Sequence, residues 1–481
     1  MRSWRVITLA SLVLMTAPVA ANPPVASYIF PAGGQRGKTV DARVGGLFLY
    51  DKCGFELPGP GVDASKELRR THTLWLEGPL LPLPDSQRQE DYPQDMAGQV
   101  KISADAPIGA RHWRVWTSQG VTPARRFVVG DLPEIVEKEL PGDPIPVEVT
   151  LPVTINGRIF PHEDVDIWSF AARKGQTISC EVEAARLGSP LDSRLEVLDP
   201  SGRAIAENDD TFGADSFIRF TAPSDGTYQV RIHDINYKGG QAYVYRLTLT
   251  ADVRVDRAYP LGGRRGTKVP LTLSGQGLPQ RPVAVELPAD APSEYAHRIE
   301  VSGRRSNVFY LDVDDLPEQI ADEKKSAAAP GQKLELPAVT NGRIIKPGHA
   351  DHWSFAARKG ETFEFDLKAQ RLGSPLSGVV SILDDKGKVL VRADSGPGGR
   401  ADPWLSFTAP ADGNYTARVE SRFRSSGPEH AYRLRMARPA APDFRLRLAA
   451  DALTLNRGGQ VPLKVLVERT GGFKEPIALT L

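Results

Sequence analysis

The chain has 481 residues, and 60 Lys and Arg against 59 Asp and Glu leave a formal net charge of +1. Such a balance excludes the strongly basic footprint of a nucleic-acid-binding protein. Only two cysteines, Cys53 and Cys180, are present, which excludes a disulfide framework. At about 100–200 residues per domain, the length predicts several domains that can each bury a core.

The first 21 residues have the layout of a secretory signal peptide. Arg2 and Arg5 form a positive head, residues 6–15 are apolar, and Ala20 and Ala21 are small residues before Asn22. We expect cleavage after residue 21 and a mature chain that is secreted or held in the cell envelope, in the periplasm or at the cell surface. No later stretch reaches the roughly 20 apolar residues of a transmembrane helix, so we expect no membrane insertion after cleavage.

The sequence then repeats itself in two alternating modules. WSFAARKG at 168–175 returns unchanged at 353–360, and RLGSPL at 186–191 returns at 371–376. These motifs define modules B1 (141–251) and B2 (331–438). A fainter repeat, PAGGQRG at 31–37 and PLGGRRG at 260–266, defines modules A1 (22–140) and A2 (252–330). A1 is longer than A2, with an insertion that we place within 59–100, and 439–481 is expected to be an incomplete third A-type domain.

Strand signals run through both kinds of module. Apolar and polar residues alternate in YQVRI at 228–232 and in VYRLTL at 244–249, which places one face on a core and the other in water. Gly- and Pro-containing turns separate such runs, and 44 Gly and 40 Pro argue against long helices. The sequence predicts an all-β fold of tandem β-sandwich modules. Helical turns are expected only near 132–139 and 316–324.

The B modules resemble the bacterial pre-peptidase C-terminal domain. The resemblance rests on DIWSF at 166–170, LEVLD at 195–199, ENDD at 207–210 and GTY at 226–228, in that order. It implies a jelly-roll-like sandwich that lies beside the catalytic domains of secreted peptidases without performing chemistry. The A modules resemble immunoglobulin-like domains of the TIG type through their P-x-G-G-x-x-G opening, and the whole array is similar to exported surface proteins of planctomycete-like bacteria.

The same resemblance implies calcium or a polymer as ligands of such modules. Calcium prefers six to eight oxygen ligands. In B1 the candidate metal ligands are five oxygen-bearing residues: Asp166, Asn208, Asp209, Asp210 and Asp215. The alternative is that Asp166 caps a turn and that the Asn-Asp-Asp run forms an Asx turn. In B2 the run becomes Ala393-Asp394-Ser395, which removes ligands from any such site.

Catalytic motifs are missing from the sequence. Neither HExxH nor GxSxG occurs. His349 and His352 are the one close pair of histidines, but zinc prefers three or four nitrogen or sulfur donors, and B1 has Asp164 and Ile167 at the equivalent positions. We therefore expect a solvated loop there rather than a zinc site, and we expect the chain not to be an enzyme.

Aromatic residues are the better indication of a binding role. Trp168 and Trp353 lie in alternating runs and are expected in the cores, as is Cys180. Trp404, Tyr237 and Phe423 lie in or beside loops that differ between the copies, where rings often make contacts. The sequence favours a non-catalytic exported scaffold or adhesion array that binds an extracellular protein or polysaccharide. The alternative is an accessory region of a secreted peptidase or other hydrolase whose catalytic domain lies outside this chain.

Overall fold

The computed structural model describes residues 22–71, 94–138, 144–322, 327–399, 401–439, 443–453, 455, 458–470 and 473–480. The expected signal peptide, 1–21, and much of the A1 insertion lie outside the described residues. Within them nearly all regular structure is strand, as the sequence predicts, and the helical part is limited to single 3-10 turns. Among these residues, none of the helices has the length and apolar character to cross a membrane.

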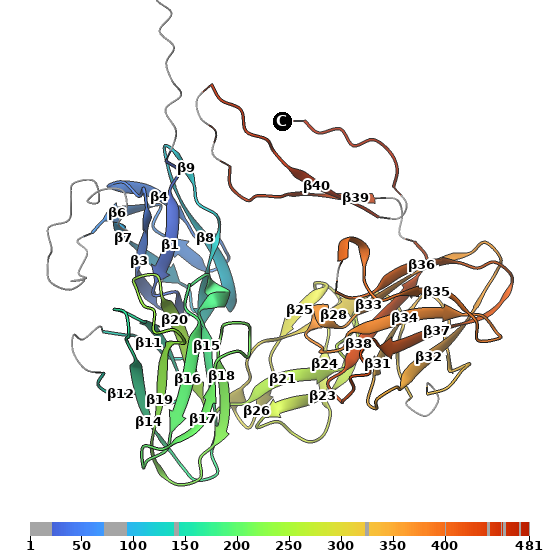
Figure 1. The fold of residues 1–481 in the computed structure, drawn as a ribbon, viewed down its shortest axis with the longest axis horizontal. Helices are drawn as coiled ribbons and strands as arrows, with labels where there is room; N and C mark the ends of the chain where they lie inside the picture. Colours follow the sequence, from blue (N-terminus) through green and yellow to red (C-terminus); the bar gives the residue numbers. More distant parts are fainter. Residues whose placement is uncertain are drawn as a thin grey trace, which may run out of the picture. The chain divides into compact units, whose positions relative to one another are not determined.

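The chain divides into two compact units (Figure 1). Unit 1 comprises Met1–Ala251 with Leu448–Lys464, and unit 2 comprises Asp252–Arg447 with Val465–Leu481. Each unit therefore holds one A module and the B module that follows it. The finer division into single modules is kept as our interpretation of the sequence repeats.

B1 consists of two five-stranded sheets. One has the order β11-β13-β20-β15-β18 and the other β12-β14-β19-β16-β17. The strands are β11 (Glu134–Val136), β12 (Val147–Glu148), β13 (Val153–Arg158), β14 (Asp166–Ala172), β15 (Thr177–Glu183), β16 (Ser193–Leu198), β17 (Ala204–Asn208), β18 (Phe217–Thr221), β19 (Gly226–Asp234) and β20 (Val244–Thr250). The 3-10 turn η2 (Ala185–Leu187) connects β15 to β16.

The B1 core lies between these two sheets. Alternate residues of β14, Trp168 and Phe170, are buried and belong to one cluster with Val182 and Leu247 of the facing sheet. Cys180 belongs to the same cluster, so the prediction of a core position for it is confirmed. Cys53 is also buried, and both thiols are free.

B2 repeats this arrangement strand for strand. Its sheets have the orders β29-β31-β38-β33-β36 and β30-β32-β37-β34-β35, which correspond one to one with those of B1. Trp353 is fully buried at the position of Trp168. The strands are β29 (Glu318–Ile320), β30 (Gln332–Lys333), β31 (Ala338–Arg343), β32 (Ala350–Ala357), β33 (Thr362–Lys368), β34 (Gly378–Leu383), β35 (Val389–Ala393), β36 (Trp404–Thr408), β37 (Gly413–Ser421) and β38 (Ala431–Ala437), with 3-10 turns η3 (Gln370–Leu372) and η4 (Pro397–Gly399).

The A modules differ in size but share one feature. A1 forms a sheet of order β1-β3-β7-β6-β4-β8-β10-β2, with β5 on β7 and β9 on β8, while A2 forms sheets β21-β23-β24, β22-β28-β25 and β26-β27. In both, the Gly-Gly segment of the P-x-G-G motif pairs in parallel with the last long strand, β2 with β10 and β22 with β28.

The A1 strands are β1 (Val25–Phe30), β2 (Gly33–Gln35), β3 (Thr39–Leu47), β4 (Lys52–Glu56), β5 (Val62–Ala64), β6 (Glu67–Arg70), β7 (Gln94–Ile102), β8 (Gly109–Thr117), β9 (Gly120–Val121) and β10 (Arg125–Gly130). The A2 strands are β21 (Arg254–Tyr259), β22 (Gly262–Arg264), β23 (Lys268–Gln276), β24 (Val283–Glu286), β25 (Glu294–His297), β26 (Glu300–Val301), β27 (Arg304–Arg305) and β28 (Phe309–Asp314). A last pair, β39 (Asp443–Leu448) and β40 (Val465–Thr470), follows B2.

The expected helical turns near 132–139 and 316–324 are wrong for the part of these ranges that the structure describes, 132–138 and 316–322. The segments form β11 and β29, short strands that pair in parallel with β13 and β31 of the following B module. The residues after Pro133 and Pro317 satisfy their backbone groups on the neighbouring sheet, as in the hydrogen bond from Glu137 N to Asn156 O. The end of each A module thus becomes an edge strand of the next B sheet, even though the boundaries at 140 and 330 assign both strands to the A modules.

Candidate functional site

The A1–B1 joint centres on the guanidinium of Arg246 on β20. Its side chain is 3% exposed and forms two parallel hydrogen bonds with Glu134, Nη1 to Oε2 at 2.9 Å and Nη2 to Oε1 at 2.8 Å. Nη1 also donates to Asn156 Oδ1 at 2.9 Å. A buried Arg with a bidentate carboxylate is held in one geometry, so β11 is fixed to the B1 sheet by side chains as well as backbone.

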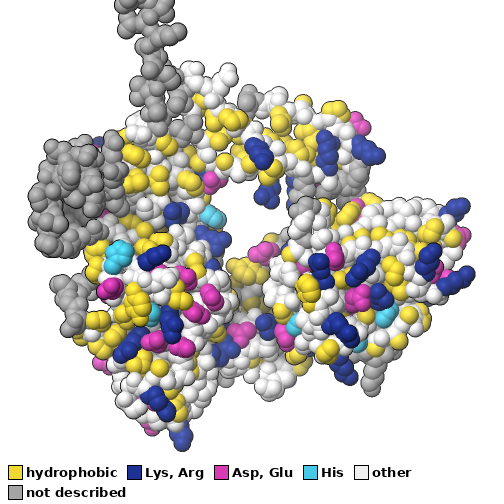
Figure 2. All heavy atoms as spheres, in the orientation of Figure 1, with side chains coloured by type: hydrophobic (Ala, Val, Ile, Leu, Met, Phe, Trp, Pro, Cys, Tyr) yellow, Lys and Arg dark blue, Asp and Glu magenta, His cyan; other side chains and the backbone are white. Residues whose placement is uncertain are grey.

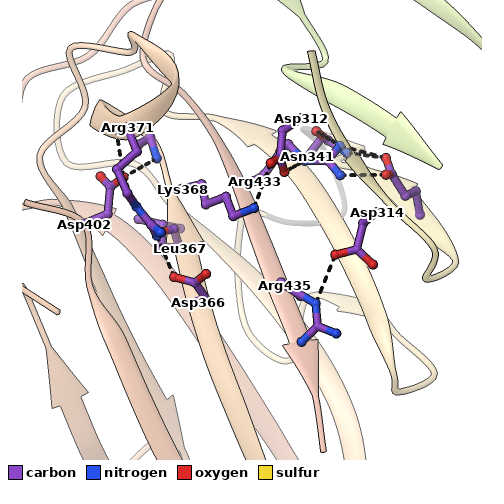
Figure 3. A network of polar contacts seen from close by, with 12 residues as sticks. Asp312, Asp314, Asn341, Asp366, Leu367, Lys368, Arg371, Asp402, Arg433 and Arg435 are labelled. Atoms are coloured by element: carbon purple, nitrogen blue, oxygen red, sulfur yellow. Dashed lines mark hydrogen bonds and ion pairs between the residues drawn. The ribbon is translucent and has the colours of Figure 1, made fainter. Parts of the chain in front are cut away.

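Unit 2 builds the same joint from the equivalent residues (Figure 3). Arg433 of β38 is 1% exposed and bonds Glu318 through both carboxylate oxygens, at 3.1 and 2.7 Å. It also donates from Nε to Asp312 Oδ2 at 2.9 Å, and Lys368 Nζ reaches Asp312 Oδ1 at 2.7 Å. Arg435 donates to Asp314 at 3.0 Å on the same face.

Each joint has a clamp made of one Arg, one Glu and one Asn: Arg246, Glu134 and Asn156 in unit 1, and Arg433, Glu318 and Asn341 in unit 2. The two joints differ in what surrounds this shared clamp. The positions of Asp312 and Asp314 in β28 correspond to Val128 and Gly130 in β10. In unit 1 the A1 core continues into B1, because Leu187 and Val244 of B1 belong to the same buried cluster as Trp113 of A1. One joint is therefore completed by apolar packing and the other by ion pairs.

In unit 1 the backbone at Gly33 lies close to the guanidinium of Arg246, and the clamp depends on this close approach. A Cβ added to Gly33 would lie 2.0 Å from Nη1 of Arg246 and 2.5 Å from the carbonyl oxygen of Val128. The first glycine of the P-x-G-G motif is thus needed for packing. Beside it, the guanidinium of Arg158 lies over the ring of Phe30, and that of Arg343 lies over Tyr259 in unit 2, at 4.4 and 4.2 Å from the ring centres.

A second duplicated polar group lies inside each B core. Trp168 Nε1 donates to the hydroxyl of Tyr245 at 3.1 Å, and that hydroxyl donates to Asp166 Oδ2 at 2.7 Å. B2 repeats the chain with Trp353, Tyr432 and Asp351 at 2.9 and 2.8 Å. Asp166 is therefore a buried acceptor on β14 and not a turn cap, and its assignment as a calcium ligand stays a prediction.

In B1 a further carboxyl group reaches this buried chain. Glu137, just after β11, hydrogen-bonds to Asp166 and accepts the backbone N–H of Arg158 at 2.8 Å. Burial, opposed in part by the hydrogen bond from Asp166, raises the pKa of Glu137 to about 7. Burial and the charge of Glu137 raise the pKa of Asp166 well above its usual range. Like charges this close cannot both ionise, so the pair holds one proton.

B2 has histidine chemistry at the equivalent place. His349 Nε2 lies 3.2 Å from Oδ1 of Asp351, and the His349 side chain is only 12% exposed. The expectation of a solvated loop is thus wrong for His349. The ring instead completes the buried Asp-Tyr-Trp chain, at the position that Asp164 occupies in B1.

Asp215 likewise has a structural role. Its carboxylate accepts the backbone N–H groups of Ala184, Ala185 and Arg186, and Nε of Arg186 at 2.7 Å, so it caps η2. Asp402 does the same for η3, with Arg371 Nε at 3.0 Å. The repeated RLGSPL motif therefore supplies an Arg to a capping Asp in each copy.

The remaining expected ligands lie at one end of B1. Asn208 Oδ1 accepts from Thr211 Oγ1 and from Phe217 N, both at 2.8 Å. Neither is the bond to the N–H two residues on that defines the Asx turn of the alternative. The pKa of Asp192 is raised, first by desolvation and then by the charges of Asp210, Asp234 and Asp209. These three carboxyl groups therefore lie near Asp192. Within the described ranges no three His, Cys, Asp or Glu residues are placed to hold a metal ion. Calcium at this end of B1 stays a prediction.

The aromatic expectations are met in part. Trp168 and Trp353 are core residues, while Tyr237 is 51% and Phe423 71% exposed. Trp404 begins β36 and is half-buried. Two sets of functional residues were not predicted from the sequence: Glu134, Asn156 and Arg246, and their counterparts Glu318, Asn341 and Arg433. Their identity in the two copies was the available signal, because polar residues repeated inside one chain at matching positions indicate a shared contact.

Comparisons with known proteins agree with this picture for B1. Residues 164–234 match the family model of the bacterial pre-peptidase C-terminal domain. A probable subtilase-type serine protease of Deinococcus radiodurans is 43% identical over 74 residues, which are 15% of this chain and 10% of the protease. The chain thus matches about a tenth of the length of that curated relative.

Two solved structures show weak overall likeness. The pre-peptidase C-terminal domain of a collagenase from Bacillus anthracis has 17% identity and a TM-score of 0.19, with 23% of this chain and 98% of that chain covered. Escherichia coli alpha-2-macroglobulin has 11% identity and a TM-score of 0.18, with 87% and 31% covered. The sequence match to the family, and not these scores, identifies one pre-peptidase C-terminal domain at 164–234.

Proposed function

We propose that this chain is a non-catalytic, exported scaffold or adhesion array that presents sandwich modules to an extracellular protein or polysaccharide. The observation that carries the proposal is the twice-built joint, in which a buried Arg bonds a Glu and an Asn where an A-type strand joins the B sheet. A flexible tether needs no such clamp, whereas an array that presents surfaces at a fixed spacing does.

The buried polar groups also support a structural role. The Asp-Tyr-Trp chains and the capping aspartates form their hydrogen bonds with groups of their own B module. They therefore stabilise the modules. Pre-peptidase C-terminal domains are accessory domains of secreted peptidases, which supports an extracellular location. The expected signal peptide at 1–21 agrees with that location.

The second candidate is an accessory region of a secreted peptidase. The observation that favours it is the 43% identity of 74 residues with part of a probable subtilase-type protease. The coding sequence past Leu481 separates the candidates. A peptidase motif in the same reading frame favours the accessory role, and further sandwich repeats favour the array.

A pelleting assay tests the proposal directly. The purified mature chain is incubated with insoluble collagen, cellulose or bacterial peptidoglycan, and the pellet and supernatant are compared. We expect saturable retention on at least one of these polymers and no release of peptides from casein. Retention on none of them, or casein cleavage by the pure chain, would contradict the scaffold proposal.

A further inference from the structure

The equivalent ends of B1 and B2 carry opposite charge. In both modules a backbone hydrogen bond of 2.8 Å fixes the loop that follows β19 in B1 and β37 in B2. It runs from Ile235 N to Asp192 O in B1 and from Arg422 N to Ser377 O in B2. The loops therefore align residue for residue. The near-zero net charge of the whole chain conceals this local difference.

In B1 this end is an acidic rim, formed by the half-buried Asp192 and Asp209, the exposed Asp210 and, beneath them, the buried carboxylate of Asp234. The backbone N–H of Asp192 donates to Asp234 Oδ2 at 3.1 Å, which brings these two residues together. Desolvation, and then the charges of Asp210, Asp234 and Asp209, raise the pKa of Asp192. Lys238 is the nearby cation that opposes this effect. Tyr237 projects beside the rim, 51% exposed, with its ring stacked on His233 at 4.7 Å between centres.

In B2 the same positions form a basic tip. Ser377, Ser395 and Ser421 replace three of the rim aspartates, and the loop presents Arg422, Phe423 and Arg424. All three loop residues are exposed, and Phe423 is 71% exposed with the guanidinium of Arg422 5.5 Å from its ring centre. Arg422 shares a weak 3.6 Å contact with Asp394, the one rim carboxylate that B2 retains.

We propose that the basic tip of one chain docks onto the acidic rim of a second copy, which joins chains head to tail. The argument is charge complementarity within one sequence: exposed guanidinium groups and an exposed ring on one module, and a cluster of crowded carboxylates with an exposed tyrosine on its equivalent. A contact between two different surfaces is heterologous, so it extends into open chains or closes into rings. This self-association does not depend on polymer binding, so either proposal can fail without the other.

The visible faces of both units otherwise mix both signs of charge (Figure 2). A docking contact therefore needs a local concentration of one sign, and the rim and the tip supply it. Electrostatic complementarity of this kind mainly accelerates association and selects the partner, and salt screens it with a Debye length of about 8 Å at physiological ionic strength.

Reciprocal charge reversal tests the proposal on the full mature chain. Sedimentation velocity is recorded for the unmutated chain, for Asp209→Lys/Asp210→Lys, for Arg422→Glu/Arg424→Glu and for an equal mixture of the two variants. We expect the unmutated chain to show concentration-dependent association at low salt, weakened at least tenfold at about 0.5 M salt. Each variant alone is expected to be monomeric, and the mixture to associate again, because it contains one intact rim and one intact tip.

Matched controls keep the result specific. Asp385→Lys and Arg305→Glu reverse exposed charges elsewhere in unit 2 and are expected to leave association unchanged. Circular dichroism and thermal midpoints confirm that each variant folds. A monomeric unmutated chain at all concentrations at low salt overturns the proposal, as does a mixture that stays monomeric. Retention of the basic tip on heparin without self-association would also overturn it and assign the tip to an anionic polymer.

Discussion

Arg433 and Glu318 face each other through two parallel hydrogen bonds, Nη2 to Oε1 at 2.7 Å and Nη1 to Oε2 at 3.1 Å. Arg246 and Glu134 do the same in the other unit. A bidentate pair between buried groups has one favourable geometry, whereas removal of one partner leaves the other charge without compensation. The stability of the A–B joint therefore depends on both members being present.

Arg433→Met is expected to destabilise unit 2 by about 3–5 kcal/mol, because Glu318 and Asp312 lose their shared cation. Urea unfolding of the full chain, followed by circular dichroism, measures the change. Arg438→Met is the matched control: its 2.7 Å pair with Glu361 is 71% exposed on the Arg side, so its loss should cost less than about 1 kcal/mol. Equal effects of the two substitutions would contradict a special role for the joint.

The pH dependence of unit 1 is expected to follow Glu137 and Asp166. Their pKa values are raised in the folded state, so the folded chain holds a proton that the unfolded chain has released. The stabilisation is complete below the unfolded value near 4.5 and is lost as the pH rises toward about 7. Unit 1 should therefore be less stable at neutral pH than near pH 5, by on the order of 1–3 kcal/mol.

Glu137→Gln is the test of that assignment. An amide can still accept the N–H of Arg158 and donate to Asp166, but it cannot take up the proton. We expect the fall in the thermal midpoint of unit 1 between about pH 5 and about pH 7 to shrink in this variant. An unchanged pH profile would assign the dependence to other groups.

Asp215→Ala is expected to destabilise B1 by about 2–4 kcal/mol, since it strips three backbone N–H groups and Arg186 of their acceptor. Asp225→Ala serves as the control, because within the described residues its carboxylate accepts one hydrogen bond, from the exposed N–H of Lys174. We expect this substitution to cost under about 1 kcal/mol. Thermal unfolding of both variants gives the comparison. A cost for Asp215→Ala no larger than that for Asp225→Ala would exclude the capping role.

Calcium binding at the acidic rim is tested by the thermal midpoint of B1 with calcium and with chelator. If the prediction holds, calcium raises the midpoint, and Asp209→Asn/Asp210→Asn abolishes the increase by removing oxygen charge. Asp385→Asn leaves the increase intact, because that residue lies elsewhere. An identical midpoint with calcium and with chelator would refute the prediction.

Side-chain alternation and internal repeats predicted the all-β fold, but they predicted the candidate site only in part. The pattern DIWSF places Asp166 on the same face as Trp168 and Phe170, so alternation indicates a buried Asp. The prediction of calcium as a ligand rests on the resemblance to the family. β11 and β29 were missed because three-residue edge strands take their structure from the sheet that they join. Such pairing depends on partners distant in sequence, here Thr154 to Asn156 and Val339 to Asn341.

Distance measurement between A1 and B1 tests the rigid joint most directly. Spin labels at Asp63→Cys on β5 and Ala171→Cys on β14, with Cys53 and Cys180 replaced by alanine, report the separation by pulsed electron resonance. We predict one narrow distance distribution, which broadens when Arg246→Met removes the clamp on Glu134. A distribution that is already broad with Arg246 in place would contradict the account of a fixed A–B unit.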